Sequence, residues 1–136
     1  MSYMFFQCFS LQELDLSNFS GKNLELINHM FYQCCSLKTL NLSNFYIDKP
    51  NNLNNMFYDC SSLETLDLSN LHMQNITHMS RTFSFCTYLK ELNISNLKTG
   101  SGANLNNIFE KCHSLKKLKC SDIKIKFMNK NACLIH

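Results

Sequence analysis

The stretch MFYQCCSLKTLNLSNF, residues 30–45, decides the fold, because it returns almost unchanged as MFYDCSSLETLDLSNL at residues 56–71. The two copies begin 26 residues apart, and one cysteine recurs at that same interval along the chain. These cysteines are Cys8, Cys34, Cys60, Cys86 and Cys112. A fixed period of about 20 to 50 residues is typical of proteins that stack one small structural unit on the next. The 136 residues therefore predict a single repeat solenoid.

Each repeat carries the pattern L-x-x-L-x-L, which predicts a short strand. In the third repeat Leu63, Leu66 and Leu68 alternate with polar residues, as expected of a strand with one buried face. A turn follows whose asparagine can hydrogen-bond the backbone of its own and of the neighbouring coil. These turn asparagines are Asn18, Asn44, Asn70 and Asn96. On the return leg, Met-Phe-x-x-Cys-x-x-Leu has the spacing of one or two helical turns with an apolar face.

We therefore predict an α/β fold, a right-handed leucine-rich-repeat solenoid of five coils over residues 1–125. Short parallel strands should line its concave face, and short helical turns should line its convex face. Residues 126–136 are predicted to form a basic C-terminal tail. The sequence contains no run of 18 apolar residues, so we expect no membrane-spanning helix. We also expect no secretion signal.

The repeats resemble the BspA-like leucine-rich repeat family, whose units read roughly MFxxCxxLxxLDLSNF followed by a short V-T-x-M segment. Here ITHM at residues 76–79 and LNNM at 53–56 approximate that segment, and the resemblance covers residues 4 to 122. Members of that family are mostly surface-associated or secreted proteins, often implicated in adhesion. The resemblance thus implies an adhesin-like protein at a cell surface, and it implies no particular set of binding residues.

The periodic cysteines have three possible roles: buried free thiols, disulfide partners or metal ligands. One inward position occupied in every coil favours small, buried free thiols, since cysteine is among the most buried residue types. Adjacent coils are expected about 4.8 Å apart, which also lies within the Cα separation of a disulfide. A zinc site would require C-x-x-C pairs, and the sequence has none. We expect buried thiols and no cofactor, with disulfides or a metal as the alternatives.

The motifs predict neither an enzyme nor a nucleic-acid partner. With three glycines there is no phosphate-cradling loop, and no histidine stands beside a nucleophile and an orienting carboxylate. The exposed strand positions run from acidic Glu13 and Asp15 in the first coil to basic Lys117 and Lys119 in the last. These lysines lack the interleaved aromatic residues of single-strand binders. The opposite charges of the two ends instead predict head-to-tail self-association, and the alternative is a chain shortened from a longer repeat array.

An aromatic column is predicted on the convex side. Phe6, Tyr32 and Tyr58 hold one outward position of the first three coils, and the series ends at Ser84 and Glu110. The rings either lean over the convex turns without a further role or form a contact patch for a protein partner. Aromatic anchors are frequent in protein interfaces, and the strand face carries none.

The sequence ends Cys133-Leu134-Ile135-His136, which is the C-a-a-X pattern of prenylation. Cys133 occupies a position that is polar in the earlier coils, whereas Leu134 and Ile135 match core positions and could instead begin a sixth coil. Six lysines against one aspartate between residues 113 and 136 suit an anionic membrane surface. A prenylated tail would hold the protein at the cytosolic leaflet.

Two functions follow from these observations. The first is a non-enzymatic protein-binding repeat module, adhesin-like and associated with the cell surface or a membrane, as the resemblance implies. The second is a soluble cytosolic scaffold that binds a protein partner through the solenoid. The sequence does not identify that partner or the solenoid face it contacts.

Overall fold

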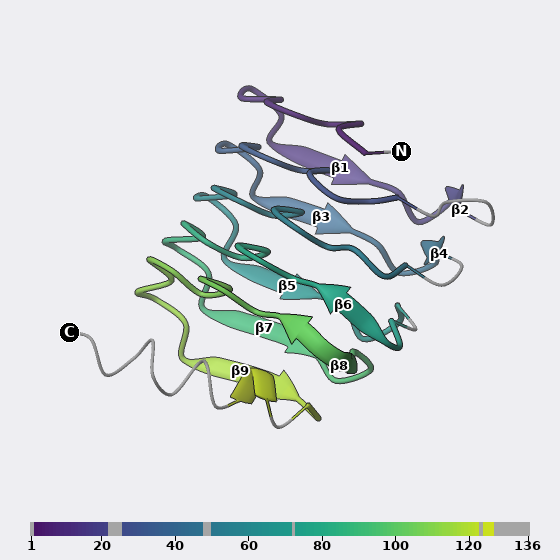
Figure 1. Ribbon diagram of the computed structural model, residues 1–136. Coiled ribbons are helices and arrows are strands. Elements are labelled where there is room, and N and C mark those ends of the chain that lie inside the picture. The colour runs from purple at the N-terminus through teal and green to yellow at the C-terminus, as the bar shows by residue number, and fades with distance from the viewer. Residues whose placement is uncertain (1, 22–25, 48–49, 72, 123, 127–136) are drawn as a thin grey trace.

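The computed structural model describes residues 2–21, 26–47, 50–71, 73–122 and 124–126, and the chain is a β-solenoid of stacked parallel coils (Figure 1). From Glu13 in the first strand to Lys117 in the last, the chain advances 104 residues, or four periods of 26. The predicted solenoid is therefore confirmed, but it makes about four turns rather than five.

The first ladder of strands forms at the leucine pattern. Its members are β1 (Glu13–Asp15), β3 (Thr39–Asn41), β5 (Thr65–Asp67), β7 (Glu91–Ile94) and β9 (Lys117–Cys120). β1 pairs with β3, and β5, β7 and β9 form one three-stranded sheet. All these pairs are parallel and join residues 26 apart, such as Leu92 and Leu118. The predicted parallel strands are confirmed.

A second ladder follows the asparagine turns and was not predicted. Its members are β2 (Ser20–Gly21), β4 (Tyr46–Ile47), β6 (Ile76–His78) and β8 (Thr99–Asn104). β2 pairs with β4, and β6 with β8, again in parallel. The register shifts within the second pair, and Gly102, with φ of 66°, lies in the longer strand β8.

The helical turns predicted for the Met-Phe-x-x-Cys segment are wrong: among the described residues, only 124–126 are helical. The segment makes tight turns instead. His29 and Gln33 have φ of 57° and 56°, which a right-handed helix excludes. The equivalent residues of the later coils share this conformation. They are Asn55, Asp59, Arg81, Phe85, Asn107 and Lys111.

Hydrogen bonds across the coils explain these turns. The N–H of Tyr32 donates within its own turn to His29 at 3.2 Å, whereas Phe31 donates to Met56 of the next coil at 2.9 Å. This alternation repeats along the stack, so the turns form a third ladder. Because this third ladder holds the turn side itself at one strand spacing, about 4.8 Å, adjacent coils leave no room there for α-helices about 10 Å wide.

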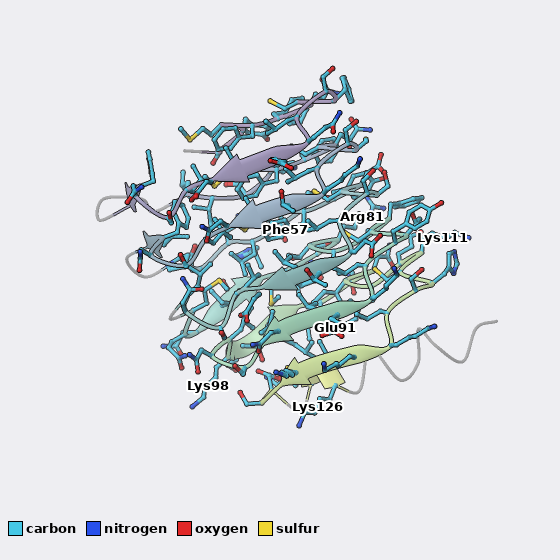
Figure 2. The ribbon with its side chains drawn as sticks, turned by 180° about the vertical axis from the view of Figure 1, so that it is seen from behind. Phe57, Arg81, Glu91, Lys98, Lys111 and Lys126 are labelled. Atoms are coloured by element: carbon cyan, nitrogen blue, oxygen red, sulfur yellow. The ribbon has the colours of Figure 1, made fainter. Side chains whose placement is uncertain are left out.

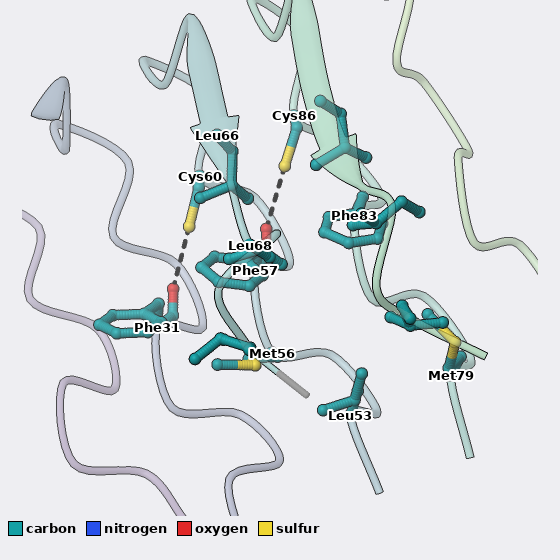
Figure 3. Packing of buried hydrophobic residues seen from close by; sticks show 14 of the residues in the cluster. Phe31, Leu53, Met56, Phe57, Cys60, Leu66, Leu68, Met79, Phe83 and Cys86 are labelled. Atoms are coloured by element: carbon teal, nitrogen blue, oxygen red, sulfur yellow. Dashed lines mark hydrogen bonds between the residues drawn. The ribbon is translucent and has the colours of Figure 1, made fainter. Parts of the chain in front are cut away.

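Columns of equivalent side chains fill the core. The phenylalanine column stacks with ring centroids 5.2 to 5.8 Å apart, and Figure 3 shows part of it. Its members are Phe5, Phe31, Phe57, Phe83 and Phe109. In the methionine column Thr82 replaces a methionine, and its buried hydroxyl donates to the Met79 carbonyl at 2.8 Å. The core is therefore continuous from coil to coil.

The turn asparagines differ in their contacts. Asn70 donates to the carbonyl of Ser43 in the preceding coil at 2.9 Å, and Asn96 donates to Ser69 in the same way. Asn18 and Asn44 are exposed. The asparagine therefore ties adjacent turns together in the third and fourth coils.

Candidate functional site

The predicted aromatic residues lie in one stack along the turn side of the solenoid. The rings of Phe6 and Tyr32 are 5.0 Å apart and nearly parallel, and those of Tyr32 and Tyr58 are 4.8 Å apart at 7°. The turn ladder sets this spacing, because it places equivalent residues of adjacent coils one above the other. Phe85 continues the stack, with its ring 5.3 Å from that of Tyr58. We call Phe6, Tyr32, Tyr58 and Phe85 the aromatic column.

The prediction that the aromatic series ends at Ser84 is wrong, because Phe85 extends the column by one ring. Ser84 is fully buried and donates its hydroxyl to the carbonyl of Asn107. The next residue, Phe85, has φ of 62° and supplies the ring instead. The signal in the sequence was an aromatic residue at a repeat position that is otherwise polar. The matching residues are Gln7, Gln33, Asp59 and Lys111.

Two further rings flank the top of the aromatic column. Tyr3 stacks on His29 at 4.8 Å, and both rings contact the column, at Phe6 and Tyr32. Amide nitrogens of Asn28 and Asn55 lie 3.1 Å from the two ring nitrogens of His29. Burial lowers the pKa of His29, which favours its neutral form. The flank is thus aromatic and uncharged.

The aromatic column is partly open to solvent. Phe6 is exposed, and Tyr32, Tyr58 and Phe85 are half-buried. Burial raises the pKa of Tyr58, as does neighbouring Tyr32, so its hydroxyl stays protonated. Arg81, labelled in Figure 2, lies close enough to Tyr58 for its charge to act on that hydroxyl. Aromatic residues beside arginine are the usual composition of an interface hot spot.

The strand face carries a shallow groove of about 330 Å³ across β5, β7 and β9. Within it Lys117 forms an ion pair with Glu91 at 2.9 Å, and Asn93 donates to Asp67 at 3.1 Å. Just outside it, Lys90 binds Glu64 at 2.6 Å. These ion pairs are exposed, as Figure 2 shows for Glu91, and such pairs contribute little binding energy. The groove lining contains no aromatic residue.

The periodic cysteines are hydrogen-bond donors within the core. The thiols of the four later cysteines donate to the carbonyl of the phenylalanine 29 residues earlier, and Figure 3 shows the bonds of Cys60 and Cys86. Cys34 and Cys112 donate in the same way, at 3.1 and 2.9 Å. Cys34, Cys60 and Cys86 are buried, while Cys8 and Cys112 are half-buried. All five are free cysteines.

The three buried thiols are poorly suited to nucleophilic or metal chemistry, which require the thiolate. Burial raises the pKa of Cys34 to about 12 and those of Cys60 and Cys86 well above the ordinary value. In the part of the chain that the structure describes, no three histidine, cysteine or acidic side chains cluster to hold a metal ion.

The predicted lipidation residue, Cys133, lies outside the described residues, as does Lys130. Five lysines of the same basic segment are exposed. They are Lys116, Lys117, Lys119, Lys124 and Lys126. The described part of the chain forms no helix that is apolar and long enough to span a bilayer.

Comparison with known families finds one match. The model of a family described as Mycoplasma protein of unknown function, DUF285, matches residues 1–65 and again residues 51–130. The two overlapping matches agree with an internally repeated chain. No curated protein matches the chain. No solved structure matches it either.

Proposed function

Because the chain belongs to the DUF285 family, whose function is unknown, we propose its role from geometry: a non-enzymatic repeat module that binds a protein through the aromatic column. The observation that carries this proposal is the stack of Phe6, Tyr32 and Tyr58, which lies on an outer edge although the core already contains its own phenylalanine column.

The stack is suited to binding because it is rigid before a partner arrives. Tyr32 lies between two rings, at 5.0 and 4.8 Å, and the turn ladder fixes the backbone beneath it. Little side-chain entropy is then lost on association, which favours affinity. The hydroxyl groups of Tyr32 and Tyr58 add hydrogen-bonding capacity at the rim of an apolar surface.

The resemblance to BspA-like repeats supports a location at the cell surface, where the protein would bind its partner as an adhesin. The alternative is a soluble cytosolic scaffold that uses the same column. A prenylated Cys133 with the exposed lysines would place the module at the cytosolic leaflet of an anionic membrane.

Binding is tested by mutation of the column against a matched control. The chain is immobilised and presented first with a panel of extracellular-matrix proteins and then with extract of its own cell. The double variant Tyr32→Ser with Tyr58→Ser should lose a bound protein that the wild type retains. Tyr88→Ser removes a tyrosine that is 62% exposed and lies outside the column, so this variant should bind like the wild type. Equal binding by the double variant and the wild type would refute the role of the column.

The setting is tested by fractionating the native cell. Surface labelling of the intact cell should modify an adhesin and leave a cytosolic scaffold unlabelled. If Cys133 is prenylated, the intact mass should carry the prenyl group and Cys133→Ser should move the protein into the soluble fraction. An unmodified chain that is soluble in both forms would leave the cytosolic scaffold.

A further inference from the structure

The first coil exposes large apolar side chains. Tyr3, Met4, Phe6 and Phe9 are 51%, 42%, 37% and 53% exposed. Phe9 stands at a repeat position that is small or polar in the later coils, where Cys35, Ser61, Thr87 and His113 follow. Repeats that close a solenoid in water carry a polar outer face. The exposed face of the first coil is therefore apolar rather than polar.

Two core columns, those of the strand leucine and of the cysteine, end in half-buried residues at both ends of the stack, although Phe109 and Leu115 of the last coil are buried. Leu14 and Leu118 are half-buried, whereas Leu66 and Leu92 of the same column are buried between neighbours. Cys8 and Cys112 are likewise half-buried, and the cysteines between them are buried. Each of these end residues would gain burial from one more coil.

The strands at the two ends carry opposite charges in the same columns. Glu13 and Asp15 are exposed on β1, and Lys117 and Lys119 are exposed on β9. Among the described residues, β1 pairs only with β3, and β9 only with β7. Within the chain, Glu91 and Lys117 form an ion pair at 2.9 Å from positions 26 residues apart. Side chains in one column of adjacent coils are therefore within ion-pair reach.

From these three observations we propose that the first coil binds the last strand of a second copy of this chain, so that β1 of one copy continues the parallel ladder from β9 of the other. In the register of the inner strands, Glu13 would oppose Lys117, and Asp15 would oppose Lys119. Leu14 would pack on Leu118, and both would become buried. Contact between two first coils would instead oppose like charges, which destabilises a strand pair.

The same stacking completes the cysteine ladder. Each later cysteine donates its thiol to a phenylalanine carbonyl 29 residues earlier. In the assembled ladder, the Cys8 thiol would meet the carbonyl of Phe109 in the neighbouring copy at the equivalent position. Because the two contacting surfaces differ, the contact does not close on itself, and it produces open-ended chains of copies rather than a symmetric dimer.

Sedimentation velocity of the full chain tests this proposal over a hundredfold range of concentration at low and high salt. We expect a series of growing species that shifts toward monomer as salt screens the charges. Glu13→Lys and Lys117→Glu should each weaken association about tenfold, since each replaces an attraction by a repulsion. The combined variant restores opposite charges, so it should return to within about threefold of the wild type.

Lys98→Glu is the matched control, because it makes the same charge change as Lys117→Glu at an exposed residue outside β9. It should associate like the wild type, and circular dichroism should show that all variants fold alike. A wild type that stays monomeric at every concentration would overturn the proposal. So would a combined variant as weak as the single variants, or a Lys98→Glu variant as weak as Lys117→Glu.

Discussion

Replacing Phe57 by alanine should cost about 4 kcal/mol of unfolding free energy, whereas the same change at Phe5 should cost about 2 kcal/mol. Phe57 is fully buried, and its ring lies between those of Phe31 and Phe83, at 5.2 and 5.8 Å. Deleting a ring of this kind removes its burial and leaves a cavity, which together cost about 3–5 kcal/mol. Phe5 is half-buried and stacks on Phe31 at 5.5 Å. It therefore has roughly half as much burial to lose.

Urea unfolding followed by circular dichroism measures both losses. With a slope near 2 kcal/mol per molar, the midpoint should fall by about 2 M for Phe57→Ala and by about 1 M for Phe5→Ala. Phe57→Leu and Phe5→Leu keep most of the volume and should preserve the order of the two effects if either alanine variant does not fold. Equal losses at the two positions would refute the reasoning, because an inner coil would then gain nothing from having neighbours on both sides.

Three further predictions concern the cysteines, the turn asparagines and acid stability. A thiol reagent at pH 8 should label Cys34, Cys60 and Cys86 only as fast as the chain opens, because burial raises their pKa; rapid labelling before denaturant is added would contradict the ladder. Asn70→Ala should lower the unfolding free energy measured in urea by about 1–2 kcal/mol, because the Asn70 amide donates to the carbonyls of Leu42 and Ser43. Asn44→Ala, at an exposed residue, should lower it by less than about 0.5 kcal/mol. Burial raises the pKa of Asp122, but hydrogen bonds from Thr99 lower it more, and the net effect is a lowered pKa. The stability that this carboxylate contributes is therefore present above about pH 4 and is lost as the pH falls through the lowered pKa. Asp122→Asn should therefore show a smaller loss between neutral and acid pH than the wild type, and an equal loss would exclude this role.

The 26-residue spacing predicted the strands and much of the core because both depend on local alternation. In L-x-x-L-x-L, every second residue faces the same side of a strand, so Leu66 and Leu68 indicate the buried face directly. A constant period then places each leucine above its equivalent in the next coil. The parallel pairing of residues 26 apart follows from these two facts.

The turn ladder could not be distinguished from helices by spacing alone. Met30, Phe31, Cys34 and Leu37 are all buried, as the apolar face of a helix would be, but two successive tight turns bury the same set. The backbone angles at His29 and Gln33 and the hydrogen bonds between coils separate the two structures. Neither residue is glycine, the residue that most often adopts positive φ, so their identity does not indicate this conformation.

The candidate site was predicted only where its residues share one repeat position. Phe6, Tyr32 and Tyr58 do so, and the structure stacks them. Tyr3 and Phe85 occupy other repeat positions, and the turns rather than the period bring their rings to the column. The period alone therefore misses Phe85, at one end of the column, and Tyr3, which flanks its other end.

Because the turn ladder builds the aromatic column, the most direct test of the account is the hydrogen-bond partner of the Phe57 amide. Scalar couplings across hydrogen bonds in solution NMR identify the donor and acceptor residues directly. We expect a coupling from the Phe57 amide to the Thr82 carbonyl and another from the Asp59 amide to the Ser84 carbonyl. In each pair the acceptor lies 25 residues after the donor. Couplings from Phe57 to Leu53 and from Asp59 to Asn55, the pattern of an α-helix, would contradict the account.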